Sequence, residues 1–176
     1  MKIYAARHGQ TSWNAQNRIL GRTDLELTET GVQQAEKLAE ILNEKNIDII
    51  LSSPLKRAIQ TSEIIAKKLG LPIKIDERLI EQNYGIYEGE DRKNEGFLNN
   101  KRNFAYRYPG GESMMQVVYR VYSLIEEIKN TYSDKTVLLV CHGGVLRILN
   151  TYFYDMTNDE FVNDIAKNTE LREYAL

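Results

Sequence analysis

Two short apolar runs, each followed by histidine and glycine, constrain the fold of this chain most strongly. Residues 2–6 lead into Arg7-His8-Gly9, and residues 137–140 lead into Cys141-His142-Gly143-Gly144. The second run is apolar throughout, which is typical of a strand buried on both faces of a parallel sheet. The chain has only two histidines, and both follow such runs. Because open α/β sheets bind ligands beyond the carboxyl ends of their strands, His8 and His142 are predicted to meet there.

The rest of the chain alternates between strand and helix patterns. Further strands are predicted at residues 48–51, 72–75 and 171–175, the last at an edge of the sheet. Helices are predicted after Thr28, after Ser53-Pro54 and after Ser113, where capping residues precede apolar positions at helical spacing, and over residues 145–154. This alternation predicts an α/β fold, a three-layer α/β/α sandwich with a mostly parallel central sheet. Without an internal repeat or a break in composition, residues 1–176 are expected to form a single domain.

Composition narrows the class of protein. Apolar residues make up 42% of the chain and charged residues 27%, and the net charge is -2. This balance gives no reason to expect nucleic acid or an anionic membrane as a partner. The single cysteine cannot form an intrachain disulfide, and the first residues carry no signal-peptide pattern. A cytoplasmic protein is therefore expected.

A cluster of cations is predicted at the carboxyl edge of the sheet. Arg7 and His8 follow the first strand, and His142 follows a later one. Arg57 lies one turn inside the helix after Ser53-Pro54, and helical side chains lean back toward their own N-terminus. Two guanidinium groups, two imidazoles and helix amino ends favour a compact dianion such as phosphate. Taken singly, a histidine at a strand end or an arginine on a helix is more often structural. The hypothesis rests on the fact that the only two histidines of the chain both follow predicted strands and both precede glycine.

Five blocks of sequence, in this order, resemble the signature of the histidine phosphatase superfamily, also called phosphoglycerate mutase-like. They span nearly the whole chain, and together they are far more specific than any one alone. The blocks are Arg7-His8-Gly9-Gln10-Thr11 with Asn14, Arg18 and Gly21; residues 52–61; Leu79 to Gly89, with Glu81; Pro109-Gly110-Gly111-Glu112-Ser113; and Cys141 to Arg147. Two positions depart from the common pattern, because Leu20 replaces a residue that is often polar and Gln10 stands where the mutases commonly have glutamate.

The resemblance implies a role for each matching residue. His8 would attack phosphorus and form a phosphohistidine, while Arg7, Arg57 and His142 would hold the phosphoryl oxygens. Glu81 would protonate the leaving oxygen and later deprotonate the attacking water. The other nitrogen of His8 is expected to be fixed by a hydrogen bond, for instance to a backbone carbonyl. Substrate binding is assigned to Asn14, Gly143, Thr11 and Arg18. No cofactor and no metal ion is expected, and the two histidines lack a metal-ligand spacing.

The expected function is that of a metal-independent phosphomonoesterase acting on a small phosphorylated metabolite. A cofactor-dependent phosphoglycerate mutase is the first alternative, but such mutases carry a sizeable insertion for which the segment from Gly89 to Pro109 leaves no room. A non-catalytic phosphate- or phosphoprotein-binding module is the second, and it is disfavoured because both histidines, both arginines and Glu81 are present. A small phosphate ester is the expected partner. A homodimer is possible, and the sequence does not decide whether one forms.

Residues 91–108 form either a substrate lid or a solvated loop. The segment mixes aromatic side chains with Arg92, Lys93, Lys101, Arg102 and Arg107. As a lid, it would favour substrates that carry a second anionic group or a ring.

Overall fold

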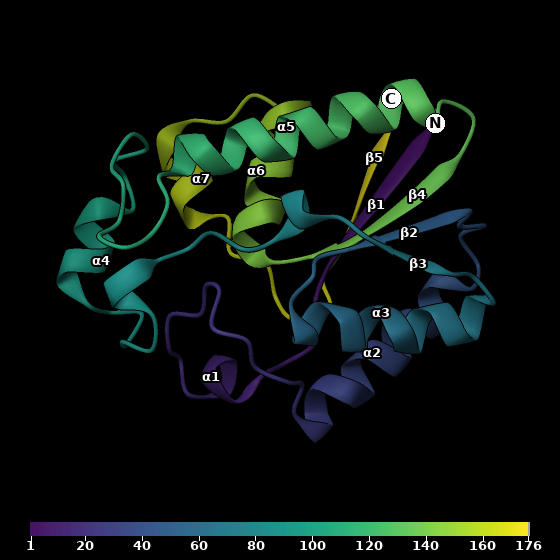
Figure 1. Ribbon diagram of the computed structural model, residues 1–176, viewed down its shortest axis with the longest axis horizontal. Helices are drawn as coiled ribbons and strands as arrows, with labels where there is room; N and C mark the ends of the chain where they lie inside the picture. Colours follow the sequence, from purple (N-terminus) through teal and green to yellow (C-terminus); the bar gives the residue numbers. More distant parts are fainter. Residues whose placement is uncertain (176) are drawn as a thin grey trace.

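A five-stranded mixed sheet forms the middle layer of the computed structural model, which describes residues 1–175 (Figure 1). The strand order is β3-β2-β4-β1-β5. The pairs β3–β2, β2–β4 and β4–β1 are parallel, and only β5 runs antiparallel, against β1. The strands are β1 (Lys2–Arg7), β2 (Ile49–Ser52), β3 (Ile73–Ile75), β4 (Thr136–Cys141) and β5 (Leu171–Ala175). The predicted α/β fold with a mostly parallel sheet is confirmed.

Helices cover both faces of this sheet. The helices α2 (Glu29–Leu42) and α3 (Lys56–Leu69) lie on one face, and α5 (Met114–Thr131) and α6 (Gly143–Phe153) lie on the other (Figure 1). Shorter helices are α1 (Ser12–Ala15), α4 (Glu95–Asn100) and α7 (Asn158–Asn163), with two 3-10 turns, η1 (Glu77–Leu79) and η2 (Gly85–Tyr87). No helix within residues 1–175 is long and apolar enough to cross a membrane.

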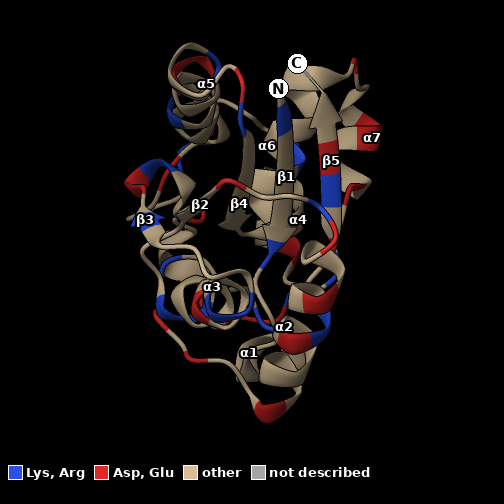
Figure 2. Ribbon diagram, turned by 90° about the vertical axis from the view of Figure 1, so that its right-hand side faces the viewer, with Lys and Arg blue, Asp and Glu red and all other residues tan. Residues whose placement is uncertain are grey.

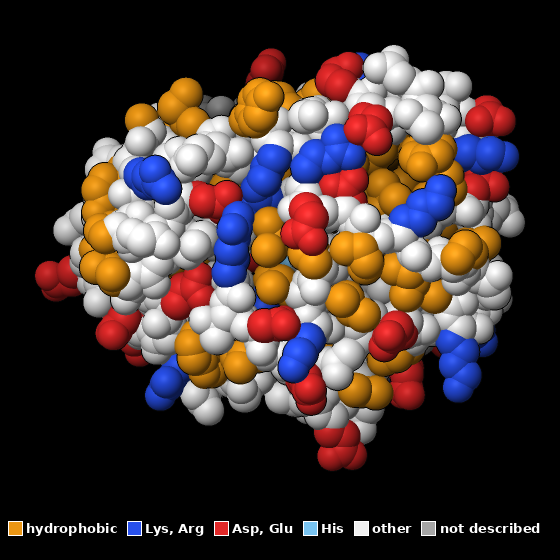
Figure 3. Space-filling model, viewed as in Figure 1, with side chains coloured by type: hydrophobic (Ala, Val, Ile, Leu, Met, Phe, Trp, Pro, Cys, Tyr) orange, Lys and Arg blue, Asp and Glu red, His pale blue; other side chains and the backbone are white. Residues whose placement is uncertain are grey.

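The alternation of side chains along β1 and β4 builds a separate core on each face. In β1, Ile3 and Ala5 pack with α5 and α6, whereas Tyr4 and Ala6 pack with α2 and α3. This is the period of two that an extended strand imposes on its side chains. The strands β2 and β4 carry no charged residue, and charges of both signs are spread over the surrounding elements (Figure 2). The face in Figure 3 likewise intermixes basic, acidic and apolar side chains.

Two helix starts agree with the predicted caps. Thr28 Oγ1 accepts a hydrogen bond from Gly31 N at 3.1 Å, which caps α2. Ser113 and Gln116 form a reciprocal capping box at the start of α5, with hydrogen bonds of 3.3 and 2.9 Å. Such caps satisfy backbone N–H groups that have no partner inside the helix.

The predicted start of α3 at Ser53-Pro54 is wrong. The helix begins at Lys56, and its N-cap residue, Leu55, makes no side-chain cap. Ser53 Oγ instead lies 2.7 Å from Nε2 of His142 and accepts a weak hydrogen bond from Leu55 N at 3.4 Å. A contact with a residue far along the chain therefore overrides the local capping preference. The helix predicted over residues 145–154 also begins earlier, at Gly143, so that its first turn directly follows His142.

Candidate active site

The parallel pairing of β1 with β4 brings the two histidines together. Arg7 pairs with Cys141, the last residues of their strands, so His8 and His142 leave the sheet side by side. Their ring centroids lie 5.1 Å apart. His8 is 2% exposed and His142 is fully buried. The meeting of the two histidines that the sequence predicts is therefore found at the carboxyl edge of the sheet.

The hydrogen bonds of His8 define its tautomer. Arg57 Nε donates to His8 Nε2 at 3.2 Å, and because a guanidinium can only donate, Nε2 carries the lone pair. The proton then lies on Nδ1, which donates to Gly9 O at 2.6 Å. Burial, together with the charges of Arg57 and Arg7, holds the pKa of His8 well below its usual value. His8 is thus a neutral imidazole with a fixed ring and a nucleophilic nitrogen, and the expected backbone partner is confirmed.

The two arginines are anchored by backbone carbonyls. Arg57, fully buried, donates from Nη1 to Thr23 O at 2.9 Å and from Nη2 to Gly21 O at 2.6 Å. Arg7 donates from Nη1 to Ala166 O at 2.7 Å. Burial lowers the pKa of each arginine to about 10, so both stay charged near neutral pH. Since neither forms an ion pair with a carboxylate within residues 1–175, their positive charge remains available to an anion.

Glu81 reaches the same place from the loop after η1. Its Oε1 accepts from Gln82 N at 2.8 Å, and its Oε2 accepts from Gly144 N at 3.0 Å, at the start of α6. The side chain is 5% exposed. Gly144 is required for this approach, because a Cβ there would lie 2.4 Å from Glu81 Oε1. The first turn of α6 therefore holds the carboxylate beside His142.

A pocket of about 190 Å³ opens over these groups. Its volume is smaller than the roughly 300–1,000 Å³ of pockets that bind drug-sized ligands. Its wall includes five of the predicted site residues: Arg7, His8, Asn14, Glu81 and Gly143. Arg57 and His142 lie directly behind His8. Several buried donors have no hydrogen-bond partner in the described part of the chain, among them Arg7 Nε and Asn14 Nδ2. Buried donors without partners are costly, which is consistent with an anionic ligand that accepts from them.

Two predicted substrate-binding residues lie outside this pocket. Thr11 is buried at the N-cap of α1, where its Oγ1 accepts from Asn14 N at 3.3 Å and its own N donates to Asn14 Oδ1 at 3.1 Å. It therefore holds Asn14 in place. Arg18 is exposed and lines a separate depression beside Asp91.

Other pocket residues received no site role from the sequence. Tyr84 and Arg147 line the wall, and Arg147 is 7% exposed. Arg147 lies in the first turns of α6. Like Arg57, it should therefore lean back toward the N-terminus of its own helix and so toward the pocket.

In the segment 91–108, Arg92 and Lys101 line the pocket, whereas Lys93 is exposed. Part of this segment thus covers the site, as a lid would.

Comparisons with known proteins agree with this geometry. The family model described as "Histidine phosphatase superfamily (branch 1)" matches residues 3–175. The chain is 34% identical to the "Uncharacterized phosphatase PhoE" of Bacillus subtilis (strain 168), over 97% of this chain and 89% of the relative. It is 38% identical to the "Probable phosphoglycerate mutase GpmB" of Escherichia coli O1:K1 / APEC, over 85% and 73%. The solved structure of a mycobacterial glucosyl-3-phosphoglycerate phosphatase with VO3 superposes with a TM-score of 0.86 at 30% identity, covering 98% of this chain and 91% of that one. The chain therefore belongs to the histidine phosphatase superfamily (branch 1), as a phosphatase.

Proposed function

We propose that this protein is a metal-independent phosphomonoesterase that works through a phosphohistidine on a small metabolite with a second anionic group. The observation that carries the proposal is the neutral His8, whose Nε2 lone pair lies among Arg7, Arg57 and His142 while Glu81 faces the same pocket. A nucleophile, fixed positive charge and a proton donor are the parts that covalent phosphoryl transfer needs.

In the first step, His8 Nε2 attacks phosphorus and the bond from phosphorus to the ester oxygen breaks. Glu81 transfers its proton to that leaving oxygen. Arg7, Arg57 and His142 stabilise the charge on the phosphoryl oxygens during the transfer. The Nδ1–H of His8, held by Gly9 O at 2.6 Å, shares the positive charge of the phosphorylated ring.

In the second step, water replaces the alcohol on the same face of the phosphoryl group. Glu81, now ionised, takes a proton from this water while the water oxygen attacks phosphorus. The bond between phosphorus and His8 Nε2 breaks, which releases inorganic phosphate and restores the neutral imidazole and the protonated carboxyl. One carboxyl group thus serves as acid and then as base.

The outer wall of the pocket supports a second anionic group on the substrate. Arg92, Lys101 and Arg147 line it, and none of the three forms an ion pair within residues 1–175. Burial, then the charges of Arg147, Arg92 and Arg102, lower the pKa of Lys101 to about 8. These cations repel one another, so a carboxylate or second phosphate between them would be stabilised. Phe97, Leu98 and Ile165 give the carbon skeleton an apolar surface.

A panel of phosphate esters tests this substrate class. Phosphoglycerates, phosphoserine and sugar bisphosphates should have higher kcat/KM than esters of uncharged alcohols. Lys101→Met should raise KM for the doubly anionic esters and leave KM for p-nitrophenyl phosphate nearly unchanged. Lys93→Met is the matched control, because this lysine belongs to the same segment but is exposed and lies outside the pocket. An equal preference for charged and uncharged esters would contradict the second anionic group.

Two alternatives are separated by direct assays. The relationship to a protein named as a probable phosphoglycerate mutase favours the mutase alternative, which transfers the phosphoryl group from His8 to a second hydroxyl. Isomerisation of 3-phosphoglycerate primed with the bisphosphate would reveal it. A non-catalytic binding module would release no phosphate from any ester in the panel.

A further inference from the structure

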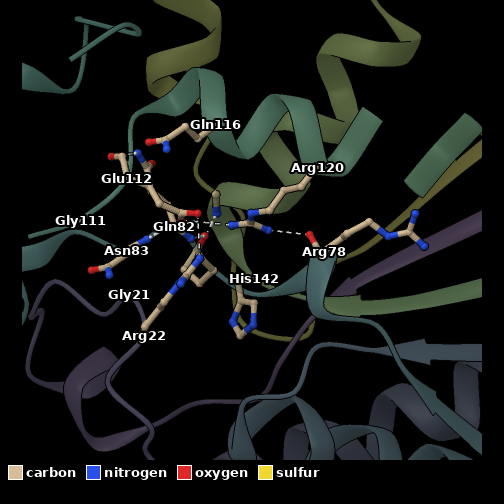
Figure 4. A network of polar contacts seen from close by, with 12 residues as sticks. Gly21, Arg22, Arg78, Gln82, Asn83, Gly111, Glu112, Gln116, Arg120 and His142 are labelled. Carbon is tan, nitrogen blue, oxygen red and sulfur yellow. Dashed lines mark hydrogen bonds and ion pairs between the residues drawn. The ribbon is translucent and has the colours of Figure 1, made fainter. Parts of the chain in front are cut away.

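A second carboxylate, Glu112, lies behind the segment that carries Glu81. Glu112 precedes the N-cap of α5, and its side chain is 15% exposed. Its Oε1 accepts from Arg22 Nη2 at 2.8 Å, and its Oε2 accepts from Asn83 N at 3.0 Å and from Arg120 Nη2 at 3.5 Å (Figure 4). One carboxylate thus connects the loop before α2, the loop after Glu81 and the helix α5.

The main chains of the two loops are also joined. Glu112 N donates to Asn83 O at 2.9 Å, and Gln82 Nε2 donates to Glu112 O at 3.2 Å. Gly111 allows this close approach, because a Cβ there would lie 2.3 Å from Asn83 O. Hydrogen bonds to the Glu112 backbone therefore hold Asn83 through its main chain and Gln82 through its side chain.

Both arginines bound to Glu112 reach the region around Glu81. Arg22 Nε donates to Glu81 O at 3.5 Å, and Arg120 Nη1 donates to Arg78 O at 2.5 Å. Arg22 also stands between Gly21 and Thr23, whose carbonyls hold Arg57 in place. Arg57 is held by these two backbone carbonyls and not by the Arg22 side chain, so the loss of the ion pair with Glu112 leaves its hydrogen bonds in place.

The negative charge of Glu112 matters because Arg120 is largely buried, with a side chain 13% exposed and an Nε that finds no hydrogen-bond partner among residues 1–175. Burial lowers the pKa of Arg120, whereas the charges of Glu112 and Glu81 raise it. If Glu112 lost its charge, the guanidinium would have Glu81 as its remaining carboxylate neighbour. Pairing with Arg120 would draw the Glu81 side chain away from Gly144 N, and a displaced carboxyl group could no longer reach the leaving oxygen.

We propose that Glu112 is a positioning residue that acts through Glu81, by binding Arg22 and Arg120 and fixing the loop at residues 81–83. The inference rests on the proposed function, in which Glu81 is the acid and base. Glu112 is not among the residues that line the pocket, so its removal should impair proton transfer and leave phosphate binding in place.

The choice of leaving group gives a readout that a general loss of structure would not produce. Alkyl phosphates need a proton on the leaving oxygen, whereas p-nitrophenol departs without one. Glu112→Gln should lower kcat/KM on an alkyl phosphate by about 10²-fold and the nitrophenol burst rate by less than about threefold. Glu127→Gln is the matched control, since Glu127 is an exposed carboxylate that pairs with the Arg78 side chain and, among the described residues, forms no hydrogen bond with residues 81–83. It should leave both rates unchanged.

A double-mutant cycle tests whether Glu112 works through Glu81. In a Glu81→Gln background, Glu112→Gln should cause no further loss on alkyl phosphates, because coupled residues are not additive. Arg22→Gln should show a smaller loss with the same dependence on leaving group, and its 37% exposed side chain keeps the test usable if Glu112→Gln fails to fold. Equal losses on both substrates, or additive losses in the cycle, would overturn the inference. A wild-type protein without phosphatase activity would instead refute the proposed function.

Discussion

Arg57 Nε lies 3.2 Å from His8 Nε2, so a cation donates a hydrogen bond to the nitrogen that is proposed to attack phosphorus. This contact orients the imidazole and keeps Nε2 free of a proton before substrate binds. Arg57 stays anchored by two backbone carbonyls, so its guanidinium is held beside the nitrogen that would receive the phosphoryl group. His8 and Arg57 thus have their reactive orientation before substrate binds, so less free energy is needed to position them in the transition state.

Replacing His8 with alanine should abolish turnover and leave the protein folded. The reason is that no other described side chain at the site offers a neutral nitrogen in this position. Rapid quenching with a labelled substrate should trap an acid-labile, base-stable phosphoryl group on the wild type and none on the variant. Arg18→Ala is a suitable comparison, because this arginine is exposed outside the pocket and its loss should change kcat/KM little. Substantial turnover by His8→Ala would refute the covalent mechanism.

Vanadate should inhibit the enzyme, and chelators should leave its activity intact. A five-coordinate vanadate resembles the phosphoryl group in transfer and should bind Arg7, His8, Arg57 and His142. A related mycobacterial phosphatase has been solved with VO3. Activity measured with EDTA, and inhibition measured against increasing vanadate, check the two halves of the prediction. A strict requirement for added divalent metal would contradict the proposed site.

Two neighbouring glycines at the start of α6 should differ sharply in tolerance. A Cβ at Gly144 would lie 2.4 Å from Glu81 Oε1, whereas a Cβ at Gly143 would meet Arg7 Nε at 3.8 Å, an ordinary contact. Gly144→Ala should therefore displace Glu81 and cost about 10²-fold in kcat/KM on alkyl phosphates. Gly143→Ala should retain most activity, and it is the control because both glycines lie in the first turn of α6. Similar activity in the two variants would show that Glu81 is not held at its present place.

The sequence predicts the sheet and the centre of the site well, because both depend on local patterns. Apolar runs place four parallel strands, and the carboxyl ends of such strands meet by topology, which brings His8 next to His142. The roles of the site residues came from the family resemblance and stay proposals. Contacts between distant segments are not visible in local patterns. Ser53, predicted as a helix cap, contacts His142 instead, and Glu112 contacts Arg22 and Arg120 from a different part of the chain.

Acid should destabilise the folded protein through its two histidines. Burial comes first, and nearby cations add to it, in holding the pKa of both His8 and His142 well below 6.5. As the pH falls through 6.5 the unfolded chain binds protons that the folded chain does not, so the free energy of unfolding decreases. Each such proton contributes a slope of about 1.4 kcal/mol per pH unit. Thermal unfolding between pH 7 and 5 should show this loss, and His142→Gln should have a shallower slope. A melting temperature that is constant over this range would contradict neutral, buried histidines.

Replacing Glu81 with glutamine should separate the two chemical steps. Glutamine keeps the shape of the side chain but cannot exchange a proton, so the rate on alkyl phosphates should fall by about 10²–10⁴-fold. The first step on p-nitrophenyl phosphate should be much less affected, because nitrophenolate leaves without a proton. Hydrolysis of the phosphohistidine should still be slow, since the base that activates water is missing.

Stopped-flow measurements on Glu81→Gln should therefore show a burst of nitrophenol, stoichiometric with enzyme, followed by slow turnover. The phosphohistidine should accumulate over the same interval and decay at the steady-state rate. Wild type should show a bell-shaped pH dependence with an acidic to neutral optimum, because Glu81 must hold a proton while His8 does not. Equal losses on both kinds of substrate, with no burst, would remove Glu81 from the acid role.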